Sequence, residues 1–318
     1  MKVMWKKLVE EMKEGSVRAL SRLITGVENR EPGWMEAMKL IFKDTGRSRI
    51  IGITGSPGAG KSVLTDQITY QLAEQGLSVG IIAIDPSSPF SGGALLGDRI
   101  RMKMSGDLGS VFIRSMATRG ALGGLSQATR DVTKILDAFG KDIIIVETVG
   151  VGQDEIDVVK TTDLVVVVCV PGQGDAIQAI KAGVMEIADI FVVNKADREG
   201  ADQVAIDIQG MLSMSASDEM PHIPIIKTIA TQGEGIQDLT DNISKILESR
   251  ERKTSREIEH LKEEILVLME REIASSVRSR WEKNGDFDAL VQKVLDRQSD
   301  PYSVVQEMIQ PIQAQLGE

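Results

Sequence analysis

The chain has 318 residues, of which 42% are hydrophobic and 26% charged. These proportions are ordinary for a folded globular protein and exclude a collagen-like or fully disordered chain, and the length allows two domains or one enlarged α/β domain. The 47 acidic residues outnumber the 37 basic ones, which gives a formal net charge of −10. Because an acidic surface repels phosphate backbones and anionic lipids, we expect neither nucleic acid nor a membrane as a partner.

The chain offers little material for membrane insertion, export or thiol chemistry. Its longest apolar run, Leu164 to Val170, is far shorter than the ~20 residues that span a bilayer. The first residues alternate charged with apolar side chains and lack the apolar core of a signal peptide. With one cysteine and two histidines, the sequence excludes a disulfide and a Cys-based zinc site, and we expect a cytoplasmic protein.

Residues 1–47 are predicted to form an N-terminal helical extension. An apolar stripe follows Ser16 at helical spacing, and the sequence Glu31-Pro32-Gly33 ends it; the stripe consists of Val17, Leu20, Leu23, Ile24 and Val27.

Residues 48–250 alternate apolar runs with amphipathic stretches. The predicted strands are Arg49–Thr54, Ser78–Asp85, Gly109–Ser115, Asp142–Thr148, Asp163–Val170, Asp189–Asn194 and Ile223–Ile229. Most are nearly continuous in Val and Ile, as strands covered by helices on both faces must be. The pattern indicates an α/β fold with a doubly wound, mostly parallel sheet, in which ligands bind at the carboxyl ends of the strands.

The strongest motif follows the first strand and fits G-x-x-x-x-G-K-[ST], the phosphate-binding P-loop. Glycines let the backbone N–H groups turn toward phosphate oxygens, Lys61 neutralises these oxygens, and Ser62 offers a hydroxyl to Mg²⁺. The motif lies between an apolar strand and a helix, which is the context it requires, so the sequence predicts a P-loop NTPase. Its residues are Gly55, Ser56, Pro57, Gly58, Ala59, Gly60, Lys61 and Ser62.

Three acidic residues are candidate ligands of the magnesium ion. Glu147 ends a strand beside the predicted phosphate site, where P-loop NTPases need a second acidic element. Asp85 ends another strand, and Asp98 lies in a glycine-rich loop long enough to act as a switch; the sequence ranks the three only loosely. The N–H of Gly150 is expected to sense the γ-phosphate, and Gln153 is one candidate for orienting the attacking water.

A second motif, Asn194-Lys195-Ala196-Asp197, follows the strand at residues 189–194. Guanine presents N1–H and N2–H₂ as adjacent donors, which the Asp197 carboxylate can accept together, whereas adenine presents no such pair. Asn194 can bond the opposite edge of the base, and the stem of Lys195 can cover its face. In a chain that also has a P-loop, this motif predicts GTP and GDP rather than ATP. A backbone N–H at Ala230 or Thr231 is expected to reach guanine O6.

Residues 251–318 are predicted to form a C-terminal helical arm. A capping box from Thr254 to Glu257 opens a long helix, which Asn284-Gly285 ends, and Asp300-Pro301 opens the last helix. The long helix has a seam of apolar residues near heptad spacing: Ile258, Leu261, Ile265, Leu268, Ile273, Val277 and Trp281. The sequence leaves open whether this seam packs on the chain's own core or makes a homodimer.

In this order the motifs resemble the metallocentre- and cobalamin-assembly class of P-loop GTPases, and more narrowly the methylmalonyl-CoA mutase-associated GTPase chaperones of the MeaB type. The resemblance covers roughly residues 45–240 closely, and the helical flanks match the family's layout. It implies a homodimeric GTPase that docks on an adenosylcobalamin-dependent acyl-CoA mutase, gates cofactor delivery and protects the mutase. It rests on the P-loop, Asp-Pro-Ser-Ser (85–88), Gly-Gly-Ala-Leu-Leu-Gly-Asp-Arg (92–99), Ser-Met-Ala-Thr-Arg-Gly (115–120), Glu-Thr-Val-Gly-Val-Gly-Gln (147–153) and Asn-Lys-Ala-Asp (194–197).

The resemblance also implies a third switch, the loop at residues 171–181. Asp175 lies in this loop, and Gln178 and Lys181 are carried over as residues that couple nucleotide state to the mutase. Two positions depart from the family pattern. Val63 replaces a common threonine that could contact the α-phosphate, and Ala176 replaces an expected acidic residue, which leaves the particular mutase open.

Two other functions remain as alternatives. A nickel metallochaperone GTPase normally needs Cys and His ligands, which are scarce here. A kinase acting on a transport protein, a description once attached to relatives of this family, needs an acceptor groove and a catalytic base, and the sequence identifies neither.

Overall fold

The computed structural model describes residues 2–85, 104–105, 108–117, 124–148, 162–172, 187–215, 223–249, 255–283 and 286–316. The chain divides into two compact units, Met1–Arg250 and Glu251–Glu318. None of the described helices has both the length and the apolar character that crossing a membrane requires.

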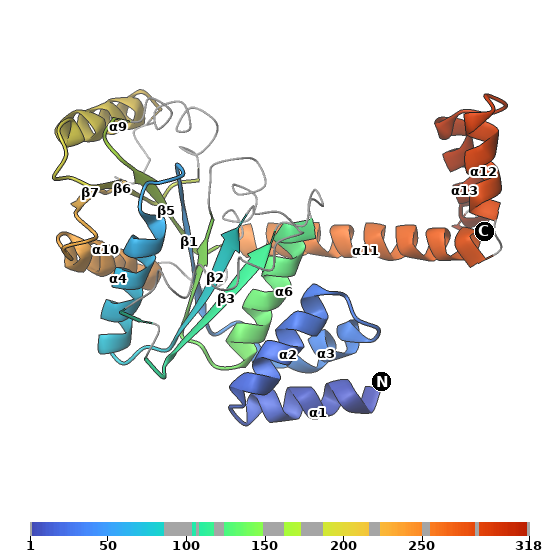
Figure 1. The fold of residues 1–318 in the computed structure, drawn as a ribbon, viewed down its shortest axis with the longest axis horizontal. Helices are drawn as coiled ribbons and strands as arrows, with labels where there is room; N and C mark the ends of the chain where they lie inside the picture. The colour runs from blue at the N-terminus through green and yellow to red at the C-terminus, as the bar shows by residue number, and fades with distance from the viewer. Residues whose placement is uncertain are drawn as a thin grey trace. The chain divides into compact units, whose positions relative to one another are not determined.

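The first unit is built on a seven-stranded sheet with the strand order β3-β2-β4-β1-β5-β6-β7 (Figure 1). All six neighbouring pairs are parallel, which confirms the predicted α/β fold. The two edge strands differ slightly from the predicted ranges. Strand β3 begins and ends two residues later than predicted, and β7 is shorter at both ends. The strands are β1 (Arg49–Gly55), β2 (Val79–Asp85), β3 (Val111–Ala117), β4 (Ile143–Glu147), β5 (Leu164–Cys169), β6 (Ile190–Asn194) and β7 (Ile225–Thr228).

Helices cover both faces of this sheet. Helices α4 (Lys61–Glu74) and α10 (Ile236–Ser249) share one core with Ile143 and Ile145 of β4. Alternate residues of the same strand, Ile144 and Val146, face a second core that includes α6 (Gly124–Ala138). Helix α9 (Ala201–Ser215) packs on β5 and β6. Every residue of β4, β5 and β6 is buried, which explains their continuous apolar sequences.

The N-terminal helices α1 (Lys2–Lys13), α2 (Val17–Glu28) and α3 (Trp34–Ile41) belong to the second of these cores. A short 3-10 helix, η1 (Phe42–Asp44), leads from them into β1. The Ser16 hydroxyl caps α2 by accepting a hydrogen bond from the Ala19 N–H. Four of the five residues of the predicted apolar stripe, Leu20, Leu23, Ile24 and Val27, are fully buried where α2 contacts α6 and α1. The fifth, Val17, is 55% exposed at the start of the helix. The predicted extension is therefore packed into the first unit rather than appended to it.

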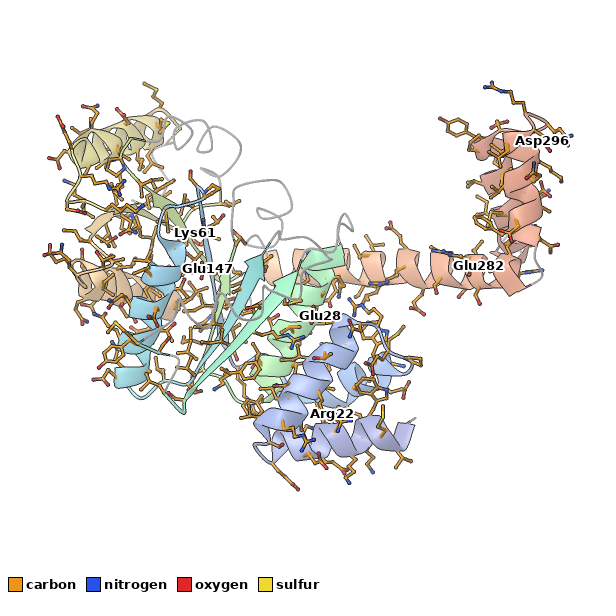
Figure 2. All side chains as sticks on the ribbon, viewed as in Figure 1. Arg22, Glu28, Lys61, Glu147, Glu282 and Asp296 are labelled. Carbon is orange, nitrogen blue, oxygen red and sulfur yellow. The ribbon has the colours of Figure 1, made fainter. Side chains whose placement is uncertain are left out.

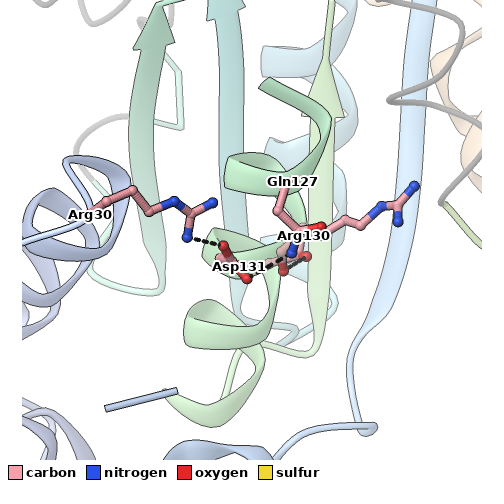
Figure 3. Close-up of polar contacts among 5 residues, drawn as sticks. Arg30, Gln127, Arg130 and Asp131 are labelled. Atoms are coloured by element: carbon pink, nitrogen blue, oxygen red, sulfur yellow. Dashed lines mark hydrogen bonds and ion pairs between the residues drawn. The ribbon is translucent and has the colours of Figure 1, made fainter. Parts of the chain in front are cut away.

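Two buried ion pairs link the end of α2 to the helix α6 and to the strand β3. Arg30 lies 2.5 Å from Asp131 of α6, and Glu28 lies 2.5 Å from Arg114 of β3. Gln127 also donates to Asp131, as the close-up shows (Figure 3). Burial raises the pKa of the Asp131 carboxyl, although the Arg30 charge acts to lower it. Arg30 therefore supplies the counter-charge that a buried carboxylate requires.

The second unit consists of α11 (Ser255–Lys283), α12 (Asp286–Leu295) and α13 (Pro301–Leu316). The last turns of α11 pack on the other two helices, where Val277, Leu290 and Val304 are buried and the Trp281 indole donates to the Met308 carbonyl. Most of the earlier part of the predicted apolar seam is exposed, at Ile258 (58%), Leu261 (47%), Ile265 (64%) and Ile273 (44%), whereas Leu268 is partly buried. The seam is thus split into a packed half and an open half.

The single cysteine gives a test of the core. Cys169 at the end of β5 is 3% exposed, and burial raises the pKa of its thiol to about 12. At pH 8 the folded protein should react with a disulfide reagent at least ~100-fold more slowly than the unfolded chain, because the thiolate is the reacting form. Because the pKa of the Cys169 thiol is higher in the folded than in the unfolded chain, burial of the neutral thiol favours the folded state. Its contribution to the free energy of unfolding is complete below the unfolded pKa of 9.0 and is lost as the pH rises toward 12. Labelling as rapid in native buffer as in denaturant would contradict the buried position.

Candidate functional site

The P-loop connects the carboxyl end of β1 to the start of α4. Gly58 and Gly60 have φ values of 75° and 89°, which glycine adopts without the strain of a side chain. A Cβ atom at Gly60 would lie 2.5 Å from Nδ2 of Asn194. The loop therefore needs glycine here both for its backbone conformation and for its contact with β6. The Ala59 N–H donates to the Ser56 carbonyl at 3.1 Å, and the binding of phosphate by the loop stays a prediction.

Lys61 is the first residue of α4 and is only 5% exposed. Its ammonium folds back over the loop and donates to the carbonyl oxygens of Gly55 at 2.7 Å and Ser56 at 3.0 Å. These two bonds hold the ammonium over the P-loop, where the motif predicts a phosphate group.

Ser62, the residue after this lysine, contacts Glu147 at the end of β4. Figure 2 labels Lys61 and Glu147 in the first unit. The Ser62 hydroxyl donates to Oε1 of Glu147 at 2.6 Å, and the Glu147 side chain is 6% exposed. The parallel register, in which Ile53 of β1 pairs with Glu147 of β4, places the carboxylate next to the P-loop. Hydroxyl and carboxylate oxygens are ligands that Mg²⁺ prefers, so two of the predicted magnesium ligands are brought together and fit the ion.

The other predicted magnesium ligands are less fully placed. Asp85 is the last residue of β2, which pairs with β4 through Ala83 and Glu147, so its backbone lies at the same edge of the sheet. The side chain of Asp85 lies outside what the structure describes. Six further predicted residues also fall outside the described ranges, and their roles stay predictions: Asp98, Gly150, Gln153, Asp175, Gln178 and Lys181.

Asn194, at the end of β6, is 2% exposed and joins three parts of the site. Its Nδ2 donates to the Ala59 carbonyl at 2.8 Å, and its Oδ1 accepts from the Thr228 hydroxyl at 3.1 Å and the Ala230 N–H at 3.2 Å. The amide therefore braces the P-loop against the loop after β7, a task that the motif alone did not reveal. Its direct bond to guanine stays a prediction.

The next residues of this motif open toward solvent. Lys195 has a left-handed backbone with φ of 58°, and its ammonium donates to the Gly58 carbonyl at 2.7 Å. Its stem thus runs from the end of β6 toward the P-loop, as a side chain that covers a base would. Asp197 is exposed, so its carboxylate is accessible to a ligand.

In the loop after β7, the structure distinguishes between Ala230 and Thr231, the two residues whose backbone N–H is predicted to bond guanine O6. The N–H of Ala230 is used by Asn194, and that of Gln232 donates to the Ile229 carbonyl at 2.8 Å. Within the described part of the chain, the N–H of Thr231 has no acceptor, and Thr231 is exposed. Thr231 is therefore the better candidate of the pair.

Two other positions complete the geometry. Val63, where a threonine is common, is partly buried against the core shared by α4 and α10, so its side chain serves packing. Asp66, which the motifs did not single out, is buried on α4 and accepts hydrogen bonds from Met104 and Ser105. The only sequence signal for Asp66 is an acidic residue four positions after Ser62, on the same face of a helix.

Comparison with known proteins identifies a matching family model and related sequences. The model of the family described as "Methylmalonyl Co-A mutase-associated GTPase MeaB" matches residues 20–285. A Pyrococcus abyssi protein that carries the name of a GTPase is 49% identical over 312 residues, which cover 96% of each chain. The mouse "Methylmalonic aciduria type A homolog, mitochondrial" is 36% identical over 219 residues, which cover 66% of this chain and 52% of the mouse protein.

A solved structure supports the fold over nearly the whole chain. The crystal structure of an "LAO/AO transport system kinase" superposes with a TM-score of 0.67 and 24% identity, and the match covers 98% of both chains. At this identity the likeness shows the fold alone.

Proposed function

The chain belongs to the methylmalonyl-CoA mutase-associated GTPase MeaB family, and on this premise we propose that it is a GTP-hydrolysing chaperone of an adenosylcobalamin-dependent acyl-CoA mutase. Its proposed cycle binds GTP, docks on the mutase, gates loading of the cobalamin cofactor and protects the mutase from inactivation. Its proposed place of action is the cytoplasm.

The observation that supports a guanine nucleotide as the ligand is the hydrogen bonding between the P-loop and the motif at residues 194–197. Asn194 and Lys195 of the base-reading motif each donate to a P-loop carbonyl, of Ala59 and Gly58 respectively. The P-loop is therefore in direct contact with the segment that leads to the exposed Asp197. This proximity supports GTP as the substrate, because a single nucleotide could reach from the loop to Asp197.

Hydrolysis follows from the charges around the P-loop. Lys61 is held over the loop, where its ammonium would neutralise charge on the β- and γ-phosphates. Ser62 and Glu147 would hold Mg²⁺, directly or through its waters, and the ion would stabilise the charge that develops on the phosphate oxygens. On nucleotide binding the Ser62 hydroxyl would turn from Glu147 to the metal. Gly150 is proposed to sense the γ-phosphate, and Gln153 to orient the attacking water.

The mutase part of the proposal is supported by the family description and by the name of the mouse relative. Asp175, Gln178 and Lys181 are proposed to pass the nucleotide state to the mutase. Which acyl-CoA the mutase uses stays open, since Ala176 departs from the acidic residue expected in this loop.

The proposal is tested by following labelled γ-phosphate from GTP with and without the cobalamin mutase of the same source. We expect free phosphate in solution, a faster release when the mutase is present, and cofactor loading that depends on GTP. Label that accumulates on a protein instead would support the kinase alternative. No release of phosphate from GTP by the wild-type protein would refute the proposal.

We further propose that the open half of the α11 seam forms a homodimer. Four of its five apolar residues are 44–64% exposed over about four turns, a larger apolar surface than an isolated helix normally leaves in water. Replacing Ile258 and Ile265 together by Glu should convert dimers into folded monomers, as measured by sedimentation. Leu295→Glu, at a position 70% exposed on α12, serves as the control and should leave the dimer intact. A dimer that survives the paired substitution would contradict this interface.

A further inference from the structure

Two threonine hydroxyls meet at the carboxyl ends of β1 and β4, beside the proposed magnesium site. Thr54 precedes Gly55, the last residue of β1, and Thr148 follows Glu147, the last residue of β4. Both threonine side chains are fully buried. The Thr148 hydroxyl donates to the Thr54 hydroxyl at 3.0 Å, across 94 positions of the chain. This bond therefore joins the ends of two neighbouring strands.

The backbone around this bond fixes the position of Glu147. Glu147 pairs with Ile53 in the parallel register of β1 and β4, and the Thr148 N–H donates to the Ile53 carbonyl at 2.9 Å. Because β4 ends at Glu147, the contacts of Thr148 continue the attachment of this strand to β1 beyond its last residue. The carboxylate is thus carried on a strand end that is held from both sides of its own position.

The threonine pair and the Glu147 side chain lie on opposite faces of the sheet. Side chains alternate between the two faces of a strand, and Ile53 and Ile145 both belong to the core that α4 shares with α10. Glu147, two residues after Ile145, therefore faces α4, where it accepts from Ser62 at 2.6 Å. Thr54, next to Ile53, faces the other way. The pair can thus hold the backbone of Glu147 without occupying the space in which the magnesium ion is expected.

We propose that the hydrogen bond between Thr148 and Thr54 positions Glu147 for magnesium binding, and so for GTP hydrolysis. The inference rests on the proposed GTPase function and deepens it. Neither threonine touches nucleotide or metal in this role, since each acts through the backbone that carries Glu147. Both are positioning residues. Removal of groups that orient the ligands of a metal typically lowers metal affinity or activity by about 10- to 100-fold.

The test replaces each threonine by valine, which has a similar shape and lacks the hydroxyl. For Thr148→Val we expect kcat for GTP to fall about 10- to 100-fold, and the dissociation constant of Mg²⁺ from the GDP-bound protein to rise by a similar factor. The dissociation constant for GDP without magnesium should change less than about twofold, because the P-loop is retained. Thr54→Val should act in the same direction, since it removes the same bond. Thr148→Ser keeps the hydroxyl and should stay within about threefold of the wild-type kcat.

The variant that lacks both hydroxyls separates positioning from stability. Each single variant leaves a buried hydroxyl without the partner described above and should lower the unfolding midpoint. Loss of both hydroxyls should recover part of the midpoint, because two valines can pack together without an unsatisfied polar group. The kcat of Thr54→Val/Thr148→Val should nevertheless stay as low as that of the single variants, because the same bond is missing in all three.

Thr240→Val is the matched control for a purely structural role. Thr240 of α10 is also fully buried, and its hydroxyl bonds Oε1 of Gln71 at 2.9 Å. Gln71 lies near the end of α4, about 15 Å along the helix from Lys61. The control should lower the unfolding midpoint and leave kcat and the affinity for Mg²⁺ unchanged.

The inference is overturned if Thr148→Val and Thr54→Val keep the wild-type kcat and magnesium affinity, or if kcat recovers together with the unfolding midpoint in the double variant. It is also overturned if Thr240→Val reproduces the kinetic changes. Should Thr148→Val fail to fold, Thr54→Val and the double variant decide the outcome. Absence of GTP hydrolysis by the wild-type protein would instead refute the proposed function, so the two failures are distinguishable.

Discussion

Replacing Lys61 by alanine is expected to weaken the binding of GTP and GDP by about a thousandfold, since removal of one partner from a buried charge pair costs about 2–5 kcal/mol. The Lys61 ammonium is 5% exposed and already held over the loop by the carbonyls of Gly55 and Ser56, so it is pre-positioned for phosphate. The measurement is titration calorimetry with GDP and Mg²⁺.

Lys141→Ala is the matched control for this experiment. Lys141 is 7% exposed and donates to the Ser110 carbonyl at 2.7 Å, so the two lysines share burial and a main-chain acceptor. Lys141 lies just before β4, at the edge of the sheet away from the P-loop. The control should lose stability and keep its affinity for GDP. A GDP affinity of Lys61→Ala within about tenfold of the wild-type value would show that the P-loop lysine does not bind phosphate here.

Replacing Asp197 by asparagine is expected to lower the preference for GTP over ATP by about a hundredfold or more, because two guanine donors would lose their shared acceptor. The Asn amide would instead donate to a base oxygen, so xanthosine diphosphate, which carries an oxygen at C2, should gain affinity relative to GDP. Competition among GDP, ADP and xanthosine diphosphate on the same variant measures both changes.

Asp202→Asn provides the control for the base-reading argument. Asp202 is an exposed acid on α9, five residues further along the chain, where it pairs with Lys227. Removal of its charge should leave the ratio of GDP to ADP affinity unchanged. If Asp197→Asn and Asp202→Asn behave alike, Asp197 does not read the base.

The features of this protein that could be predicted from the sequence are those that depend on residues close together in the chain. A strand covered on both faces must be apolar at nearly every position, and β4, β5 and β6 are both apolar and completely buried. The P-loop is likewise a contiguous motif, in which Lys61 and Ser62 are neighbours. The family was identified from such motifs, and the family model confirms it over residues 20–285.

The parts that sequence did not predict are contacts between distant residues. Asn194 reaches Ala59 across 135 positions, Arg30 reaches Asp131 across 101, and Asp66 reaches Ser105 across 39. The hydrophobic periodicity of a sequence does not predict such pairs of residues, because their contacts depend on the order of the strands in the sheet. The order β3-β2-β4-β1-β5-β6-β7 brings β4 and β1 together although about 90 residues separate them, as parallel strands with long crossovers allow.

This strand order explains the contacts of Asn194 that the motif did not predict. Its amide braces two loops, because β6 ends beside the P-loop and beside β7. The bond from Asn194 to the base stays a prediction. Similarly, the apolar stripe of α2 predicted a helix but not its partner. Only the packing of α2 on α6, fastened by Arg30 and Asp131, shows that these helices are part of the first unit.

The close approach of Gly60 to Asn194 has a consequence for anyone who wishes to transplant nucleotide specificity. A Cβ at Gly60 would overlap the amide nitrogen of Asn194, which itself holds Ala59. The P-loop and the segment at residues 194–197, which we propose bind phosphate and read the base, can therefore not be exchanged independently. A chimera that receives only one of these two segments would have either a steric clash at Gly60 or a missing hydrogen bond to Ala59. The two segments would therefore have to be transferred together.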